Sequence, residues 1–230
     1  MSAEAVAATP VGPGVWQVTA GTFSSNCYIH SVSNGACVIV DPGLDPQSID
    51  QQVGALGLTP AAVLCTHGHF DHVGGASHFQ DRYGIAVHLP QADAATAKSS
   101  NFLLMALKIP ARIKLAEFTP VPPGGATVRV GDTDYRYVPC PGHTPGSSII
   151  CIDGYGFSGD SIYARGVGLS MLPGENHAQL KSSLQTLWST LPRSMTICPG
   201  HGPVATWDTI RETNMALREF LSVHHAAGNA

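Results

Sequence analysis

The sequence predicts an α/β fold in which two packed β-sheets are flanked by helices. Short apolar runs broken by Gly, Pro and Asn dominate the first 45 residues and return after about residue 126. Each set of strand-like runs is followed by segments whose apolar residues recur at helical spacing. Strands, helices, strands and helices in that order indicate two similar halves. A length of 230 residues, 43% of them hydrophobic, fits one large domain or two small ones.

The first half begins with strands and then alternates strands with helices. Strands are expected at residues 14–20, 26–32, 36–40, 61–65 and 85–90. The segment 45–57 starts with Asp and places Ile49, Val53 and Leu56 on one face, which predicts a helix. A second helix is expected at 74–84.

The second half follows a segment that interrupts this alternation. Residues 91–118 are helical in composition, so we expect a helical insertion there. Strands resume at 126–131, 134–140, 147–153 and 194–203. Helices are expected at 175–191, where four leucines share one face, and at 207–223.

The composition argues against several classes of partner. A net charge of -4, a pI near 6.2 and the absence of a basic cluster argue against nucleic acid. The N-terminus lacks the pattern of a signal peptide, and no window is apolar enough to span a membrane. The six cysteines form no Cys-x-x-Cys pair and lie mostly in apolar runs, which favours buried free thiols. We therefore expect a soluble cytoplasmic protein. The sequence predicts no oligomeric state.

The sequence Thr-His-Gly-His-Phe-Asp-His at residues 66–72 is the strongest signal for chemistry. It directly follows a predicted strand, so His67 and His69, two residues apart, are expected to point to the same side. Asp71 and His72 follow where the chain turns into a helix. A carboxylate beside imidazoles either orients a ring or binds metal itself. Three histidines and an aspartate in six positions have no good packing explanation, so we expect a metal site.

Three later residues offer further ligands of the same kinds. His143, Asp160 and His201 each follow a strand-like segment, where loops carry site residues on a rigid sheet. Five histidines and two aspartates suit Zn, Fe or Mn and exceed what one tetrahedral site uses, so two divalent metal ions, with Zn first, are expected. The remaining histidines are expected to be surface or satisfied residues: His30, His78, His88, His177, His224 and His225.

From Asp-Pro-Gly at 41–43 through the 66–72 motif, Pro-Gly-His-Thr-Pro-Gly-Ser at 141–147, Gly-Asp at 159–160 and Pro-Gly-His-Gly at 199–202, the chain resembles the metallo-β-lactamase fold hydrolases. It is most similar to the short glyoxalase II-like (hydroxyacylglutathione hydrolase-like) members. The resemblance implies a single αββα sandwich domain over residues 1–230. It also implies one metal on His67, His69 and His143, a second on Asp71, His72 and His201, and Asp160 bridging them. The two aspartates, Asp71 and Asp160, are the catalytic candidates.

Such a site predicts a hydrolase with a thioester substrate. Two cations about 3.5 to 4 Å apart can hold a bridging water whose pKa falls towards 7, and the resulting hydroxide attacks a carbonyl. A thiolate leaves without strong acid help, so an acyl thioester is the small molecule we favour. Two alternatives use the same scaffold: a lactonase, and an Fe(II) persulfide dioxygenase-like oxidoreductase using His67, His143 and Asp160. A non-catalytic binding protein is disfavoured because all seven ligands are present.

Two segments offer candidate residues for contact with the substrate. In the insertion, Leu104 and Met105 can form a lid over an acyl chain, and Lys108 and Arg112 can receive a carboxylate. The alternative is a helical hairpin with a buried apolar face. After Asp160, the further candidates for substrate contact are Tyr163 and Arg165. The basic C-terminal extension by which glyoxalase II holds glutathione has no counterpart, because only 29 residues follow His201.

Overall fold

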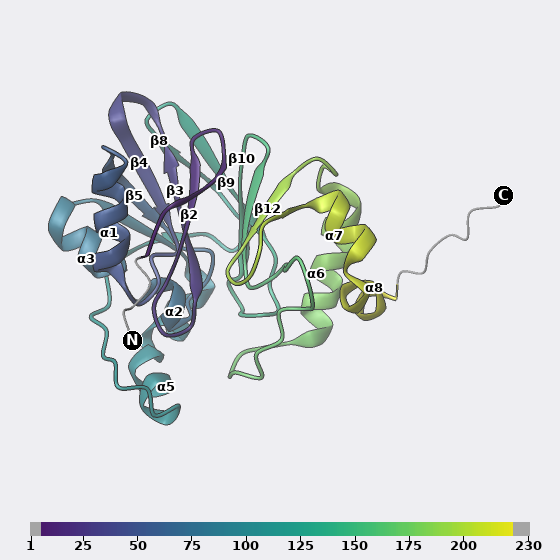
Figure 1. Cartoon of the computed structure of the whole chain (residues 1–230). Coiled ribbons are helices and arrows are strands. Elements are labelled where there is room, and N and C mark those ends of the chain that lie inside the picture. The colour runs from purple at the N-terminus through teal and green to yellow at the C-terminus, as the bar shows by residue number, and fades with distance from the viewer. Residues whose placement is uncertain (1–5, 223–230) are drawn as a thin grey trace.

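The computed structural model describes residues 6–222 of the chain. Two β-sheets pack face to face, and helices cover the outer face of each (Figure 1). Helices from the first half of the chain lie on one side of this pair and helices from the second half lie on the other. The predicted arrangement of two mixed sheets flanked by helices, an αββα sandwich, is therefore confirmed.

The first sheet contains seven strands in sequence order. They are β1 (Thr9–Gly12), β2 (Val15–Ala20), β3 (Ser25–Ser31), β4 (Ala36–Val40), β5 (Thr59–Leu64), β6 (Ala86–Pro90) and β7 (Phe118–Val121). β1 to β4 pair antiparallel, and β4 to β7 pair parallel. Parallel neighbours require crossover connections, which here contain helices. Consequently the loops after β4, β5 and β6 all emerge at one edge of the sheet.

The second sheet has six strands in the order β13-β12-β11-β10-β9-β8. They are β8 (Thr127–Val130), β9 (Thr133–Pro139), β10 (Ser148–Ile152), β11 (Tyr155–Gly159), β12 (Thr196–Pro199) and β13 (Ala205–Thr206). β11 and β12 pair parallel, with Gly159 opposite Pro199, whereas the other neighbours pair antiparallel. The residues after β11 and β12 therefore leave the sheet side by side.

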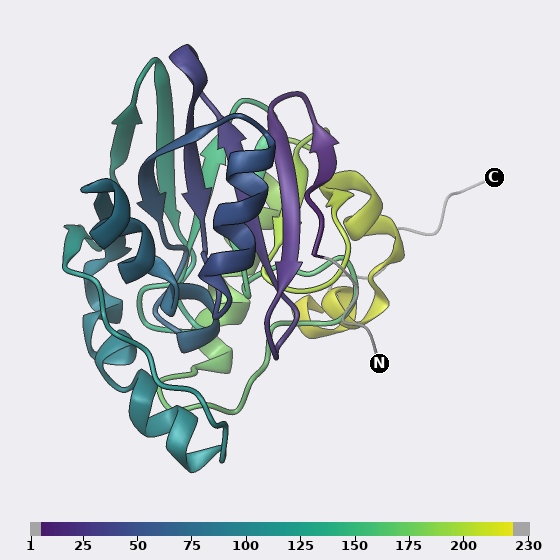
Figure 2. The same cartoon turned by 60° about the vertical axis from the view of Figure 1, so that its left-hand side comes forward.

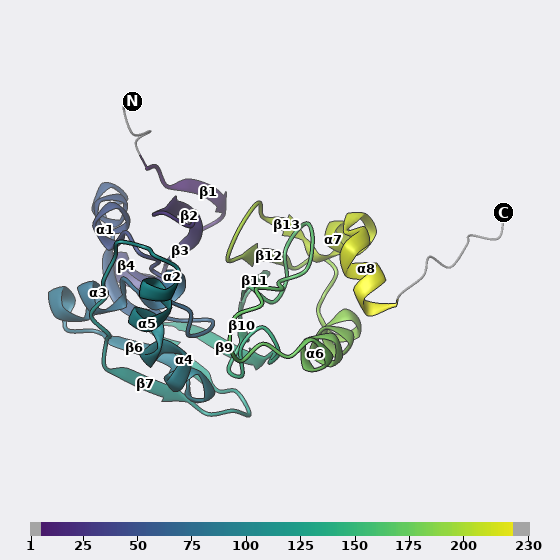
Figure 3. The ribbon, with the colours of Figure 1, turned by 90° about the horizontal axis from the view of Figure 1, so that it is seen from below.

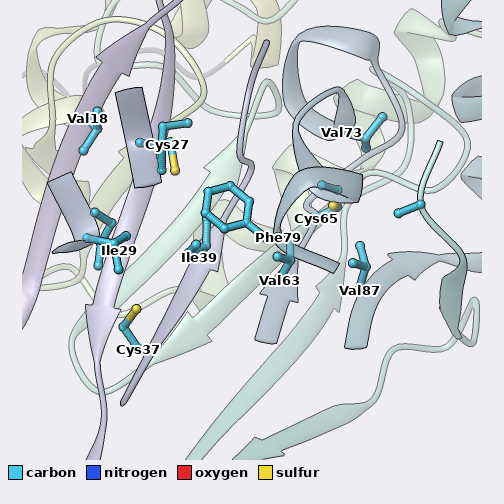
Figure 4. Close-up of a cluster of buried hydrophobic side chains, with 14 of the residues drawn as sticks. Val18, Cys27, Ile29, Cys37, Ile39, Val63, Cys65, Val73, Phe79 and Val87 are labelled. Carbon is cyan, nitrogen blue, oxygen red and sulfur yellow. The ribbon is translucent and has the colours of Figure 1, made fainter. Parts of the chain in front are cut away.

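Two helices cover the first sheet, α1 (Pro46–Ala55) and α3 (Ala76–Tyr83), and Figure 2 shows α1 lying in front of its strands. Asp45 begins α1 by accepting a hydrogen bond from the Ser48 amide at 3.2 Å, as expected for an N-cap. Phe79 of α3 is fully buried, and Figure 4 shows it beside Ile39 and Val63 of the sheet. Burial of an aromatic side chain of this kind stabilises the fold by roughly 1.5–3 kcal/mol.

The second sheet is covered by α6 (His177–Thr190), α7 (Trp207–Thr213) and α8 (Met215–Leu221). The single helix expected at 207–223 is interrupted at Asn214, and Val223 lies outside the described residues. The Asn214 side chain begins α8 by accepting from the Leu217 amide at 3.0 Å. It also donates to the carbonyls of Tyr163 and Gly166. The break thus ties the C-terminal helices to the loop that follows β11.

The insertion at 91–118 is helical only in its first part. It contains the 3-10 turn η2 (Gln91–Asp93), α4 (Ala94–Lys98) and α5 (Ser100–Ala106), followed by an irregular segment that leads into β7. The expected helix beyond residue 106 is wrong. Lys108 has a left-handed φ of 56°, and Pro110 lacks the amide that a helix interior needs. The side-chain amide of Asn101 donates a hydrogen bond to the backbone carbonyl of Ile113 and accepts one from the backbone amide of Ile113, at 2.9 Å each.

Two further sequence predictions concern chemistry and membrane insertion. All six cysteines are buried and free, as predicted. Among residues 6–222, none of the helices combines the length and the apolar character that crossing a bilayer requires.

Candidate metal centre

The 66–72 motif lies at the edge of the first sheet where β5 ends. His67 and His69 follow the strand directly, and Asp71 and His72 lie on α2 (Phe70–Val73), a single helical turn. Phe70 anchors this turn, because its ring packs against Phe23 and the leucines of α5. All four candidate ligands of the motif are buried.

The second sheet supplies the other three candidate ligands. His143 follows β9, Asp160 follows β11 and His201 follows β12, all at the end of the sheet that faces the 66–72 motif. Gly200 is required for this approach, because a Cβ atom there would lie 2.1 Å from Asp160 Oδ1 and 2.6 Å from His72 Cε1. Figure 3, seen from below, shows the loops of the two halves meeting at this edge.

The seven side chains form two groups. Candidate donor atoms of the first group (His67, His69, His143 and Asp160) all lie within 4.8 Å of one another, and so do those of the second group (Asp71, His72 and His201). His201 Nε2 lies 3.3 Å from Asp71 Oδ2. The structure thus brings together every metal ligand expected from the sequence.

Asp160 belongs to the first group and also faces the second. Its Oδ2 is 3.5 Å from His143 Nε2 and 3.6 Å from His201 Nε2, and its Oδ1 is 3.4 Å from His72 Nε2. One carboxylate therefore faces a histidine of the first group and two of the second. A carboxylate in this position faces candidate ligands of both groups.

Several buried polar atoms of the cluster lack a hydrogen-bond partner among the described residues. They are Nε2 of His67, His69 and His72 and Oδ1 of Asp160. Buried polar atoms in native proteins are almost always paired, so four such atoms in one place require an explanation. Imidazole nitrogens and carboxylate oxygens are the donors that Zn, Fe and Mn accept. The donor set therefore fits a metal centre.

The electrostatics of the cluster favour a cation. Burial lowers the pKa of His67, and it lowers the pKa of His69 to about 4, so both rings are neutral at pH 7 with a free lone pair. For Asp160, burial raises the pKa, but the neighbouring His72 outweighs this and the net pKa is well below its usual value. Burial lowers the pKa of His72, whereas Asp160 and Asp71 more than compensate and raise it. The ionised carboxylates thus attract positive charge, which a bound cation supplies.

Asp41 holds the motif in place and was not assigned a role from the sequence. Its carboxylate accepts hydrogen bonds from the Thr66 amide at 2.8 Å and the Thr66 hydroxyl at 2.6 Å, and it lies 3.1 Å from His72 Nδ1. A ring nitrogen held this way leaves the opposite nitrogen, Nε2, directed to the cluster. Its place in Asp-Pro-Gly directly after β4, at the same sheet edge as the motif, was the available signal.

His143 is held by the loop that follows Asp160. Its Nδ1 lies 3.0 Å from the carbonyl oxygen of Gly168. That loop is braced by Glu175, whose carboxylate accepts from the amides of Ser170 and Met171 at 2.7 Å each. Glu175 was not singled out from the sequence, because its two shortest hydrogen bonds are accepted from backbone amides.

The His201 loop is attached to the first sheet. The Asn26 side chain donates to the carbonyls of Pro199 and Gly202, at 3.0 and 2.8 Å. The Tyr28 hydroxyl donates to the carbonyl of Pro199 at 2.8 Å. Thus β3 of the first sheet positions a ligand carried by the second.

Comparison with known protein families shows to which family the chain belongs. Residues 20–201 match the family model of the metallo-beta-lactamase superfamily. The chain belongs to this superfamily. A probable metallo-hydrolase of Bacillus subtilis, YqgX, is 30% identical over 208 residues, which cover 87% of this chain and 95% of that protein.

A curated relative and a solved structure give further comparisons for this metallo-beta-lactamase superfamily chain. A hydroxyacylglutathione hydrolase of Serratia proteamaculans is 32% identical over 182 residues, covering 78% of this chain and 62% of that protein. The crystal structure of TTHA1623 in a di-iron-bound form matches with a TM-score of 0.78 and 30% identity, covering 86% of this chain and 98% of that chain. Membership and the His/Asp cluster together indicate a metal-dependent hydrolytic enzyme.

Among the candidates for substrate contact in this superfamily member, only Tyr163 lies against the cluster. Its ring centroid is 6.3 Å from that of His201, and burial together with the charge and hydrogen bond of Asp160 raises the pKa of its hydroxyl. Arg165, Lys108 and Arg112 are exposed, and the structure does not bring their charges into the cluster.

The two proposed lid residues have opposite environments. Leu104 is fully buried in a small cluster with Phe70 and Leu103, whereas Met105 is 68% exposed. Leu104 therefore supports the turn that carries Asp71 and His72, which is the packing role considered from the sequence.

Most of the other histidines have ordinary partners. His30 lies 2.5 Å from the Tyr135 hydroxyl, His78 lies 3.0 Å from Asp50, and His177 lies 3.3 Å from Glu175. His88 is half-buried. His224 and His225 lie outside the described residues.

Proposed function

We propose that the protein is a dinuclear metal-dependent hydrolase that cleaves an acyl thioester. The observation that carries this proposal is the position of Asp160 between the two groups of candidate ligands. His67, His69 and His143 would hold one cation, and Asp71, His72 and His201 would hold the other. Two bound divalent cations supply a water of near-neutral pKa and a Lewis acid for a carbonyl oxygen.

The protein groups around this centre are in suitable protonation states. His67 and His69 are neutral because burial lowers their pKa values, and Asp160 is ionised. Tyr163 keeps its proton because its pKa is raised, so its hydroxyl can donate a hydrogen bond beside Asp160. An oxygen that gains negative charge during acyl transfer is stabilised by such a donor.

A thioester is the favoured substrate for two reasons. A thiolate is a good leaving group, so the reaction needs no histidine or lysine to act as a general acid and protonate it. In addition, five of the six large apolar side chains that are exposed in residues 6–222 lie on two segments beside the site. Phe102, Met105 and Leu107 belong to α5 and its end, and Leu169 and Met171 belong to the loop that holds His143. Such surfaces suit an apolar acyl group.

The Serratia relative supports the reaction class by its name, hydroxyacylglutathione hydrolase, although the match covers 62% of that protein. The thiol carrier is therefore treated as a variable of the test. Acyl thioesters of glutathione, coenzyme A and a simple alkyl thiol should be compared, with short and long acyl chains of each.

The test combines metal analysis with three assays on the same preparation. Protein purified anaerobically without added metal is analysed by inductively coupled plasma mass spectrometry and assayed for thioester hydrolysis, lactone hydrolysis and oxygen uptake. About two cations per chain with thioester cleavage, lost on chelation and restored by Zn, Fe or Mn, is the expected result. One Fe per chain with oxygen consumed on glutathione persulfide would replace the proposal with a dioxygenase. Lactone cleavage without thioester cleavage would make the protein a lactonase.

A further inference from the structure

Asp93 is a buried carboxylate that belongs to none of the ligand motifs. It ends η2, directly after β6, and it is 0% exposed. Its Oδ2 accepts hydrogen bonds from the Gly68 amide at 2.7 Å and the Thr144 hydroxyl at 2.6 Å. Its Oδ1 accepts from the Gly146 amide at 2.6 Å. All three bonds are short, as expected for an ionised acceptor.

The three donors belong to the two loops that carry the histidines of the first group. Gly68 lies between His67 and His69, and Thr144 and Gly146 follow His143. One carboxylate thus joins segments that are about 75 residues apart and belong to different sheets. Asp93 makes no comparable contact with the residues of the second group.

The packing around Asp93 leaves little room for adjustment. A Cβ atom at Gly68 would lie 2.8 Å from the Asp93 carbonyl oxygen, and one at Gly146 would lie 2.7 Å from its Cγ. The absence of side chains at these two positions lets both loops close on the carboxylate. The relative position of the loops is therefore fixed by Asp93 rather than by contacts between the loops alone.

The presence of a carboxylate at this buried position requires an explanation. No Lys or Arg of residues 6–222 forms an ion pair with it, so its carboxylate is stabilised by these three donors and by the nearby His143. Burying a charge in this way is costly, and an apolar side chain would fill the space at less cost. A carboxylate offers only acceptors, which is what two amides and a hydroxyl that all point inward require. Asparagine would turn an N–H towards one of these donors.

We propose that Asp93 is a positioning residue that sets the geometry of His67, His69 and His143 for the first cation. The inference rests on the proposed dinuclear site, but it concerns metal binding and is independent of the substrate. Removing a group that orients ligands typically weakens metal binding by about 10- to 100-fold. Because Asp93 contacts only the loops of the first group, its removal should weaken binding of the second cation much less.

The test uses Asp93→Asn, with Tyr135→Phe as the matched control. Tyr135 is fully buried and loses a hydrogen bond to His30 at the opposite end of β3, away from the cluster. Affinities for Zn and Co(II) are measured by chelator competition, and the visible spectrum of the Co(II) protein reports the geometry of each site. His143→Ala and His201→Ala provide reference spectra for loss of the first and second site. Unfolding of the metal-free proteins by denaturant is measured in parallel.

The expected result is that Asp93→Asn binds one cation about 10- to 100-fold more weakly than wild type, with a Co(II) spectrum that matches His143→Ala. Tyr135→Phe should lose stability and bind both cations as wild type does. If Asp93→Asn also binds both cations as wild type does and only unfolds more easily, Asp93 has a structural role and the proposal is overturned.

A second variant covers the case in which Asp93→Asn does not fold. Thr144→Val removes one of the three hydrogen-bond donors with little change in volume. Like Asp93→Asn, it should weaken binding of the first cation, here by a few fold. Unchanged affinity in a folded Thr144→Val protein would then overturn the proposal. A wild-type chain that binds two cations but cleaves no thioester would refute the proposed function alone. A wild-type chain that binds no cation would refute both.

Discussion

The two groups of candidate ligands are held in different ways. In the first group, His67, His69 and His143 are buried, and their loops are joined by a buried carboxylate, Asp93. In the second group, the His201 side chain is 30% exposed and its loop is attached to the other sheet by Asn26. The first group is therefore fixed by the protein interior, and the second is open to solvent on one side.

This difference suggests separate tasks for the two groups. A buried, braced set of imidazoles is organised before any cation binds, so its cation should be held tightly. An open position beside an exposed ligand is what substrate binding and water exchange require in catalytic metal sites. Asp160 contacts histidines of both groups, so it links the fixed side of the site to the open one.

The largest effect is expected from removing the residue that the two groups share. Asp160→Ala should lower the metal content from about two towards one or fewer cations. It should also reduce thioester turnover by more than the roughly 10- to 100-fold typical of residues that only orient ligands. Asp134→Ala, which removes an exposed partner of Arg129, is the control. An Asp160→Ala protein with normal activity would refute the dinuclear site.

The second prediction separates the two groups directly. His201→Ala should retain one cation through dialysis against a chelator, because the first group is intact and buried. His67→Ala should retain none, because one ligand of the remaining second group, His201, is partly exposed to solvent. Metal analysis after dialysis measures both. Equal retention by the two variants would show that the contrast in burial has no consequence for affinity.

The third prediction concerns the support beneath the second group. Leu104 is fully buried against Phe70, so Leu104→Ala should lower the free energy of unfolding by about 2–5 kcal/mol. Met105→Ala, at a neighbouring exposed position, should change it by no more than about 0.5 kcal/mol. Denaturant unfolding of metal-free protein gives both values. A large increase in KM for long acyl substrates with unchanged stability in Leu104→Ala would instead support a lid.

Much of the site could be found from the sequence because its chemistry is local. Three histidines and an aspartate within six residues mark the 66–72 motif, and His143, Asp160 and His201 each follow a predicted strand. The ligands of different strands meet because the loops at one edge of each sheet face each other, which follows from the order of strands and helices. The layered fold was predictable for the same reason, from strand and helix periodicity.

Most of the residues that hold the ligands could not be found in this way, and Asp41 was marked only by its place in the Asp-Pro-Gly motif. Asp41, Asp93 and Asn26 act on partners between 25 and 176 residues away, and each uses hydrogen bonds to backbone groups. Backbone partners leave no mark on the sequence of the partner segment. The end of the helical insertion was misplaced for a related reason, since a tertiary contact from Asn101 to Ile113 holds an irregular segment of helix-compatible composition.

The smallest effect is expected at a charged network that belongs to neither group and therefore serves as a reference. Asp50 on α1 contacts His78, Arg82 and Tyr83. Partial burial raises its pKa, but hydrogen bonds from Tyr83 and His78 and the charge of Arg82 outweigh burial, so the net pKa lies below the usual 3.8. A lowered pKa in the folded state stabilises the fold above the unfolded-state value, and this contribution is lost as the pH falls through the folded-state pKa. Asp50→Asn should therefore destabilise metal-free protein by about 1 kcal/mol at neutral pH. The difference from wild type should shrink only below about pH 4. Both cations should still bind as in wild type. A difference that varied between neutral pH and about pH 5 would contradict this assignment, because the carboxyl of Asp50 titrates below that range.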